Sequence, residues 1–253
     1  MKYTFVLRDP NISLEISKNI EKRIIHQRDD NNPDLIVVIG GDGTILRAIR
    51  KYFDRLDRVV FYGINTGHLG FYTNWVIDEY EDFINAINNY TIDVEEFPLL
   101  EATINGSLVK YALNEITIRN NYVVEEFDVY IDNLLFEKFR GTGICISTAS
   151  GSTAFNKSLG GSVLDTDLEG IQLSEIASIN SNAYRTLGSS AVFSSRRKIE
   201  IKNEYKNHLM FTADQEVFEL DFENVIVKLS NKKVSFAINK SQNFWDRVKK
   251  SFI

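Results

Sequence analysis

The sequence has little of the residue types that would mark a disulfide scaffold or a histidine metal centre. Its 253 residues include one cysteine, Cys145, and three histidines. One cysteine excludes an internal disulfide, so nothing in the chain requires an oxidising compartment. His26, His68 and His208 are too few and too scattered for a metal cluster. We interpret Cys145 as a small hydrophobic residue of a strand.

Long hydrophobic runs and an excess of positive charge are also missing. No stretch approaches the roughly 18 apolar residues of a membrane span, and residues 1–20 contain no apolar segment of signal-peptide length. The chain has 29 basic and 35 acidic side chains, and its net charge is −6 at pH 7. This balance argues against nucleic acid or an anionic membrane as the main partner. We therefore expect a cytoplasmic protein that binds neither.

The most informative stretch is Leu35–Thr44, which reads LIVVIGGDGT. Its β-branched apolar run predicts a buried parallel strand. The glycines allow a sharp turn and a close approach to a ligand. The next residues place Ile45, Ile49 and Phe53 on one helical face. A strand, a glycine turn and a helix start together present backbone N–H groups to an anion such as phosphate.

The stretch belongs to neither of the two common nucleotide-binding patterns. It lacks the lysine that ends a Walker A loop, and it lacks the third glycine of the Rossmann fingerprint. The turn also contains Asp42, whose carboxylate a bound phosphate would repel. Such a group needs a role, either taking a proton from an attacking hydroxyl or contacting a metal ion. The alternative is a helix N-cap, for which Thr44 is at least as well placed.

The chain has two regions with different hydrophobic patterns. Up to residue 96, apolar strands alternate with amphipathic helices, one of them capped by Ser13, which predicts a parallel α/β layer that binds ligands at its strand ends. From residue 97 to 239 the pattern is short alternating strands, which predicts an antiparallel all-β domain. The expected hairpin turns are Asn105–Gly106, Asp132–Asn133 and Asn231–Lys232.

The last residues, 242–253, have a helical pattern and are expected to pack on the first domain. The predicted fold class is therefore α+β with two domains. Residues 1–96 and 240–253 would form a Rossmann-like parallel-sheet domain for nucleotide phosphates. Residues 97–239 would form an antiparallel sandwich that binds the rest of the ligand and makes oligomer contacts.

Two segments of the second half carry polar groups suited to a nucleoside. Asn114 and Glu115 lie in a predicted strand, Tyr111–Ile118, where a buried polar pair costs free energy unless it has partners. Asn can bind an adenine edge or a ribose hydroxyl, and Glu accepts from ribose diols. The alternative is that one of the two faces solvent, as strand alternation requires.

The second segment, Gly141–Gly161, has five glycines and seven Ser or Thr in 21 residues. Small residues let a flat ring approach, and hydroxyls supply hydrogen bonds. A flexible linker would have a similar composition, but the interleaved Phe155 and Leu159 and the strand at 144–146 favour a structured loop. Arg140 directly before it can supply a positive charge.

Taken together, these segments resemble the NAD kinases. The likeness is carried in order by GGDGT at Gly40–Thr44, the Asn114–Glu115 pair in LNEITI, and STASGSTAFNKSLGG at Ser147–Gly161. GGDGT alone is weaker, because diacylglycerol kinases, sphingosine kinases and phosphofructokinases look similar there. Supporting segments are GINTGHLGF at 63–71, ASINSNAYRTLG at 177–188 and the terminal FWDRVKKSFI.

The resemblance implies transfer of the terminal phosphoryl group of ATP to the adenosine 2′-hydroxyl of NAD, which gives NADP. Asp42 would be the general base, although a reference pKa of about 3.9 makes it a weak one. The resemblance also implies a divalent metal ion, Mg²⁺ by preference, without naming its ligands. It implies a homotetramer in which a neighbour's residues reach the site.

The same resemblance assigns two sets of binding residues. Its phosphate-binding residues are Gly40, Gly41, Gly43, Thr44 and Arg47. Its NAD-binding residues are Asp42, Gly43, Asn114, Glu115, Arg140, Thr142, Ser150, Thr153, Ala154, Phe155, Ser158, Ala177 and Gln215.

Two positions depart from the family pattern. Phe155 replaces a usual tyrosine, which keeps a ring for stacking and loses one hydroxyl. Thr142 replaces an Asp found in similar members. Two other functions stay open at this point: a lipid kinase with the same turn, and a nucleotide sensor in which catalysis has weakened. The lipid kinase would need a basic or apolar membrane-facing surface, which the acidic composition does not support.

Overall fold

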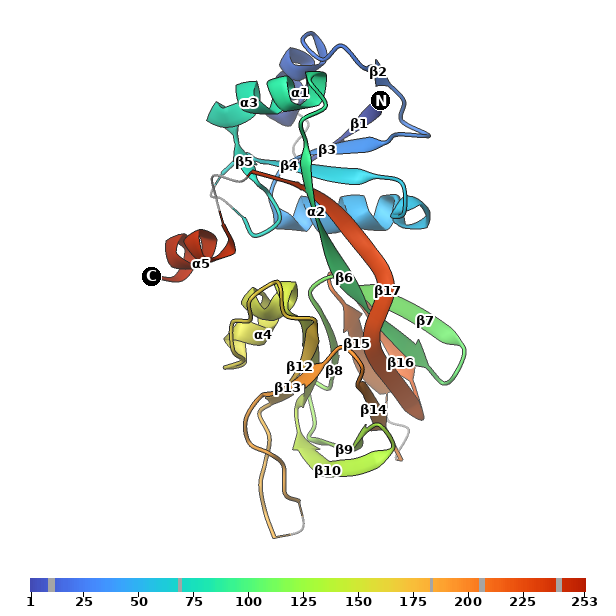
Figure 1. The fold of residues 1–253 in the computed structure, drawn as a ribbon. Coiled ribbons are helices and arrows are strands. Elements are labelled where there is room, and N and C mark those ends of the chain that lie inside the picture. The colour runs from blue at the N-terminus through green and yellow to red at the C-terminus, as the bar shows by residue number, and fades with distance from the viewer. Residues whose placement is uncertain (9–11, 68–69, 183, 205–207, 240–242) are drawn as a thin grey trace. The chain divides into compact units, whose positions relative to one another are not determined.

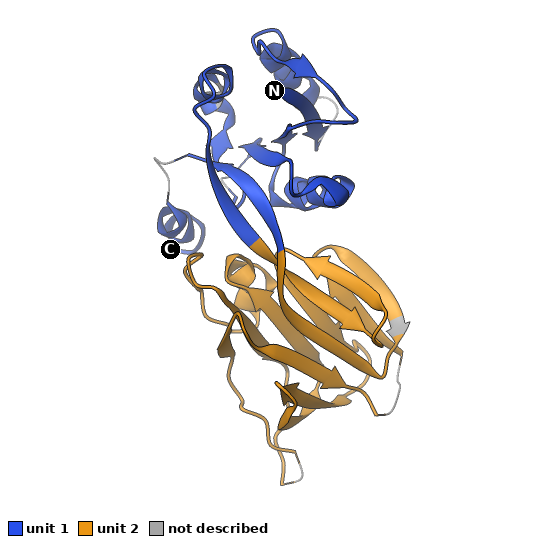
Figure 2. Ribbon diagram, turned by 45° about the vertical axis from the view of Figure 1, so that its right-hand side comes forward, with its two compact units in different colours: residues 1–97, 232–253 blue, residues 98–231 orange. Residues whose placement is uncertain are grey.

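The computed structural model describes residues 1–8, 12–67, 70–182, 184–204, 208–239 and 243–253 (Figure 1). The chain forms two compact units, which Figure 2 colours separately. Unit 1 contains residues 1–97 and 232–253, and unit 2 contains residues 98–231. Two long strands, β6 (Asp93–Ile104) and β17 (Asn224–Ile238), run from one unit into the other.

Unit 1 is built on parallel strands in the order β4-β3-β1-β2. Its strands are β1 (Lys2–Leu7), β2 (Gln27–Arg28), β3 (Leu35–Ile39), β4 (Val60–Asn65) and β5 (Trp75–Val76). The register pairs Leu7 with Ile39 and Ile39 with Ile64, so the carboxyl ends of three strands lie level. All five residues of β3 are buried, as an apolar run in a parallel sheet should be.

Helices and aromatic rings complete the core of unit 1. The helical segments are α1 (Ile12–Glu21), α2 (Asp42–Lys51), η1 (Phe53–Arg55), η2 (Ile77–Glu79), α3 (Tyr80–Asn88) and α5 (Phe244–Phe252). Tyr62 stacks on Trp75 at 3.7 Å between ring centroids and lies 4.0 Å from Phe83. Ser13 does not cap α1 as predicted, because the helix already includes it, and its hydroxyl donates to the Ile39 carbonyl at 3.4 Å. Within the described residues, no helix is long and apolar enough to span a membrane.

Unit 2 is antiparallel throughout its described strands. One sheet has the order β13-β12-β11-β8-β15-β16, and the other includes β10-β9-β14-β17 together with β6 and β7. Both sheets contribute to one hydrophobic core, which includes Phe127 and Phe139 from the second sheet and Phe211 from the first. The remaining elements of unit 2 are β7 (Leu108–Ala112), β8 (Glu115–Arg119), β9 (Glu125–Ile131), β10 (Leu134–Gly141), β11 (Gly143–Thr148), β12 (Gly170–Ile176), β13 (Ala191–Ser194), β14 (Lys198–Lys202), β15 (His208–Ala213), β16 (Glu216–Asp221), η3 (Ser150–Thr153) and α4 (Phe155–Ser158). The predicted α+β class is confirmed.

Two of the three predicted hairpins are confirmed and one is wrong. Asn105–Gly106 has φ values of 49° and 68°, and Asp132–Asn133 has 49° and 73°, the left-handed backbone that tight hairpins need. Asn231–Lys232 instead lies inside β17, which continues from residue 224 to 238. The polar residues there mark a change of partner, because β17 pairs with β14 up to Lys228 and with β4 from Ser235.

Candidate functional site

The glycine turn of unit 1 has the predicted form of a strand, a turn and a helix. β3 ends at Ile39, and α2 begins at Asp42 with Gly41 as its N-cap residue. Neither Asp42 nor Thr44 caps the helix, because Gly41 takes that place and no side chain accepts there. A Cβ at Gly40 would lie 2.4 Å from the Thr44 hydroxyl, so the turn packs too tightly for a larger residue.

The Asp42 side chain does not cap the helix, and its carboxylate instead accepts hydrogen bonds from backbone N–H groups of another loop. Its Oδ2 accepts from Phe71 at 2.8 Å and its Oδ1 accepts from Tyr72 at 3.1 Å. A Cβ at Gly70 would lie 2.2 Å from Oδ1, so glycine is needed for this approach. Burial raises the pKa of Asp42, while these two N–H groups, the charge of Arg247 and the N–H of Thr73 act in the opposite direction.

Arg247 of α5 is a residue that sequence reasoning missed. Only 7% of it is exposed, and its guanidinium donates to the Phe71 carbonyl at 2.5 Å and to the Asn74 side-chain oxygen. It therefore fixes the loop whose N–H groups hold Asp42. The sequence signal for it was weak: Arg247 directly precedes the apolar Val248 in FWDRV, and both residues are buried in α5.

Two further residues of the predicted phosphate set lie at the start of α2. Gly43 is exposed and Thr44 is buried. Arg47 is exposed, and its guanidinium donates to the Leu7 carbonyl at 2.7 Å, at the carboxyl end of β1. His68, one of the three scattered histidines, lies outside the described residues.

The Asn114–Glu115 pair does not lie in one continuous strand, as the sequence predicted. β7 ends at Ala112 and β8 begins at Glu115, so Leu113 and Asn114 form a break between them. Glu115 is buried and Asn114 is partly exposed. Burial first, and then the charge of Asp214, raise the pKa of Glu115 to about 8.

The loop after β11 is structured, and the linker alternative is wrong. Its two short helices, η3 and α4, bury Ser150 and Thr153, while Ala154 and Phe155 are partly exposed. The Phe155 N–H donates to the Glu115 carboxyl group. A Cβ at Gly151 would lie 2.0 Å from the Asn114 carbonyl oxygen, so this glycine lets the two segments touch.

Other predicted NAD-binding residues gather at the opposite end of β11. Thr142 precedes that strand, and its N–H donates to Ile176, next to Ala177. Arg140 pairs with Glu126 at 3.3 Å and lies 5.3 Å from the Tyr184 ring. The six residues of β11 separate this group from Ser150 by about 20 Å of strand. Gln215 and Ser158 are exposed.

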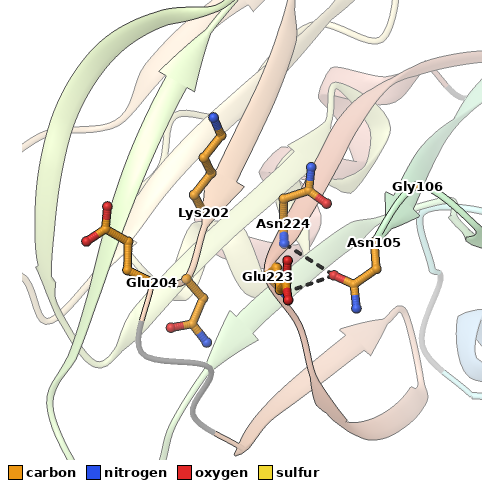
Figure 3. Close-up of a pocket in the computed structure, with 7 residues that line it drawn as sticks. Asn105, Gly106, Lys202, Glu204, Glu223 and Asn224 are labelled. Atoms are coloured by element: carbon orange, nitrogen blue, oxygen red, sulfur yellow. Dashed lines mark hydrogen bonds between the residues drawn. The ribbon is translucent and has the colours of Figure 1, made fainter.

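Unit 2 also has a hollow of about 580 Å³ that contains none of these residues (Figure 3). Its lining residues are Asn105, Gly106, Lys202, Asn203, Glu204, Glu223 and Asn224. Asn105 accepts from the N–H groups of Glu223 at 2.8 Å and Asn224 at 3.3 Å, so its side chain braces the neighbouring turn (Figure 3). We do not include this hollow in the candidate site.

Comparison with known proteins places both units in one family. Residues 6–92 match the family model of the ATP-NAD kinase N-terminal domain, and residues 113–238 match that of the ATP-NAD kinase C-terminal domain. An NAD kinase of Geobacillus stearothermophilus is 43% identical over 89% of this chain and 85% of its own length. An NAD kinase of Latilactobacillus sakei is 38% identical over 100% of this chain and 98% of its own.

Solved structures agree on the fold. The crystal structure of an NAD kinase from Archaeoglobus fulgidus in complex with ATP has a TM-score of 0.80 at 27% identity and covers 100% of this chain and 97% of its own. Yeast NADH kinase complexed with NADH has a TM-score of 0.82 at 17% identity, over 99% of this chain and 86% of its own, which supports the fold alone. With both family models matched in order and curated relatives near 40% identity, the chain belongs to the ATP-NAD kinase family.

Proposed function

We propose that this protein transfers the terminal phosphoryl group of ATP to the adenosine 2′-hydroxyl of NAD, and that Asp42 is the general base. The observation that carries the proposal is the Asp42 carboxylate at the start of α2, which accepts the backbone N–H groups of Phe71, Tyr72 and Thr73. Burial raises its pKa, which improves a carboxylate as a base toward an alcohol. The 2′-oxygen bonds to phosphorus as its proton passes to Asp42, and ADP leaves with the bridging oxygen.

The glycine turn supports the phosphate part of this proposal. A helix start whose N-cap residue is Gly41 leaves backbone N–H groups available for an anion. Gly41 and Gly43 would contact phosphates by this route. The Gly40 and Thr44 N–H groups already donate to the carbonyls of Ile64 at 2.9 Å and Gly41 at 2.8 Å, so these two residues shape the turn. Arg47 would meet the phosphates from the exposed side of α2.

The cluster in unit 2 suits the adenosine portion of NAD. The partly exposed Asn114 and the buried Glu115 supply an amide and a carboxyl group. Thr153 ends η3, Ala154 lies between the two helices, and Phe155 begins α4 with a ring face for stacking. Ser150 and Ser158 would complete this lining, with Gln215 beside it. Phe155 lacks the hydroxyl group of the tyrosine that is usual in the family at this position.

A magnesium ion fits this chain as a companion of ATP. Within the described residues, no group of three or more His, Cys, Asp or Glu could hold a metal ion. Magnesium keeps several waters and binds one or two carboxylates plus substrate phosphates, and Asp42 is the carboxylate that the turn offers. The ion would neutralise phosphate charge, while the chain itself orients the hydroxyl and takes its proton.

We also propose a homotetramer. Arg140, Thr142 and Ala177 lie about 20 Å of strand from Ser150, so these two groups lie at opposite ends of β11 in one chain. In the proposed assembly, a neighbouring copy would bring its Arg140, Thr142 and Ala177 to the NAD that Ser150 of the first copy contacts. Exposed apolar side chains on β10, of which Leu134 is 69% exposed, fit a contact between copies. The single, buried Cys145 is compatible with the cytoplasm as the working location.

The test is NADP formation by the purified protein with ATP, magnesium and NAD, run beside the same assay with diacylglycerol in vesicles as acceptor. We expect turnover with NAD and none with the lipid. Lipid phosphorylation would instead support the related lipid kinases, and NAD binding without NADP would support a sensor.

A further inference from the structure

Asp214 makes an unusual set of bonds to the segment that carries Asn114 and Glu115. It lies in the turn between β15 and β16 with a left-handed φ of 51°. Its Oδ2 accepts from the Leu113 N–H at 2.8 Å, and its Oδ1 accepts from Asn114 at 2.7 Å and Glu115 at 3.3 Å. Its own N–H donates to the Glu115 carbonyl at 3.0 Å.

Thr148 holds the same segment through its carbonyl groups. Its hydroxyl donates to the Leu113 carbonyl at 2.6 Å, and its N–H donates to the Asn114 carbonyl at 3.0 Å. The Gly151 N–H in turn donates to the Thr148 hydroxyl at 2.8 Å, which ties this clamp to η3. The break between β7 and β8 is therefore held at its N–H groups by one residue and at its carbonyl groups by another.

We infer that Asp214 is a positioning residue for the nucleotide site, because its carboxylate fixes the backbone from which Asn114 and Glu115 project. The inference rests on the NAD-binding role proposed for that pair. A binding group must be held within about 0.5 Å of its working position. Leu113 and Asn114 lie in the break, outside both strands, and Glu115 is the first residue of β8, paired with Ser147 of β11. Four bonds from one residue supply that constraint.

The charge of Asp214 gives the inference a second readout. Within the described elements packed on Glu115, the titratable groups that interact with it are Asp214 and the buried thiol of Cys145, and Glu216 acts on Asp214 in turn. After burial, Asp214 is the main influence that raises the pKa of Glu115, to about 8. Removing this charge therefore lowers the pH at which Glu115 loses its proton.

Two substitutions separate the carboxylate from the turn. Asp214→Gly removes the side chain and suits the left-handed backbone, so the turn itself is kept or strengthened. Asp214→Asn keeps one acceptor oxygen and removes the charge. Asp29→Asn is the matched control, because Asp29 also accepts two backbone N–H groups, at 3.1 and 2.9 Å, in a loop of unit 1 without candidate site residues.

The experiment is steady-state kinetics of NADP formation by the wild type and these variants, with thermal unfolding recorded in parallel. We expect the KM for NAD to rise about tenfold or more in Asp214→Gly and less in Asp214→Asn, with the KM for ATP unchanged. In Asp214→Asn the midpoint of the pH dependence of the KM for NAD should move to lower pH.

Three results decide the matter. A folded Asp214→Gly with a wild-type KM for NAD would overturn the inference, since the turn alone would then suffice. An equal rise in Asp29→Asn would overturn it as well. If the wild type makes no NADP, the proposed function fails first; if the wild type is active and the variants match it, the inference about Asp214 fails alone.

Discussion

At the scale of single residues, function depends on where a few side chains are forced to lie. Gly70 is the clearest case, because a Cβ there would lie 2.2 Å from the Asp42 carboxylate. Gly70→Ala should lower kcat for NADP formation by roughly 100-fold, since a displacement of about 1 Å at a catalytic group costs that much. Gly67→Ala is the control, because its Cβ would meet its nearest atom at an ordinary 3.8 Å. Equal activity of both variants would contradict the role of Gly70.

The buried Glu137 side chain should make the free energy of unfolding depend on pH. Burial raises its pKa from 4.5 to about 7, helped by Glu175 and opposed by the Leu187 N–H that it accepts at 3.0 Å. The folded state thus keeps a proton that the unfolded chain has released. This contribution to stability is complete below pH 4.5 and is lost as the pH rises to about 7.

The corresponding substitution is Glu137→Gln, whose amide oxygen can still accept from Leu187 and whose charge is gone. At pH 8 it should raise the free energy of unfolding by roughly 1–3 kcal/mol relative to the wild type, because the wild type then keeps a charged carboxylate buried and the neutral amide avoids that cost. At pH 4.5 the two proteins should unfold alike. Urea unfolding at both pH values measures this, and a difference independent of pH would refute it.

At the scale of elements, α5 has a role beyond covering the sheet of unit 1. Arg247→Ala leaves the Phe71 carbonyl and the Asn74 oxygen without their donor, at a cost of roughly 1–3 kcal/mol. Because Phe71 and Tyr72 hold Asp42, kcat should fall as well. Lys250→Ala, on an exposed position of the same helix, is the control for helix α5. Thermal unfolding and kcat measured together would show whether Arg247 affects stability without affecting turnover, which would argue against this link.

The elements also show what the sequence could predict. β3 and the turn after it follow from a β-branched run and adjacent glycines, and the hairpins at 105–106 and 132–133 follow from turn residues with left-handed backbone. These are local signals. β17 was predicted as a hairpin because a polar interval looks like a turn, whereas the strand changes partner there.

At the scale of the whole molecule, the order of motifs predicted the family and the alternation of apolar residues predicted the α+β class, but long-range contacts were not predictable. Arg247 contacts Phe71 and Asn74 across more than 170 residues, and Asp214 contacts the Leu113–Glu115 segment across about 100. Asp214 stands outside the motifs that carry the resemblance, and Arg247 lies in the terminal FWDRVKKSFI segment, which does not reveal its contact partners. The partners of both charged residues are distant in the sequence, so only the tertiary structure shows which groups they bind.

The proposed assembly gives a prediction at this scale. Light scattering coupled to size exclusion should give the mass of four copies of the 29.0 kDa chain. In the proposed assembly, Arg140, Thr142 and Ala177 come from a neighbouring copy to the NAD that Ser150 contacts, and the number four follows from the resemblance to the NAD kinases. A monomer with full NADP-forming activity would show that this end of β11 takes no part in binding.

The central claim is that the Asp42 carboxylate takes the proton of the 2′-hydroxyl. The most direct measurement is the rate of NADP formation by Asp42→Asn at saturating ATP, magnesium and NAD. We expect kcat to fall by about 10²- to 10⁴-fold, the usual contribution of a general base, while NAD binding measured by calorimetry stays within a few-fold of the wild type. Turnover equal to that of the wild type would contradict the mechanism.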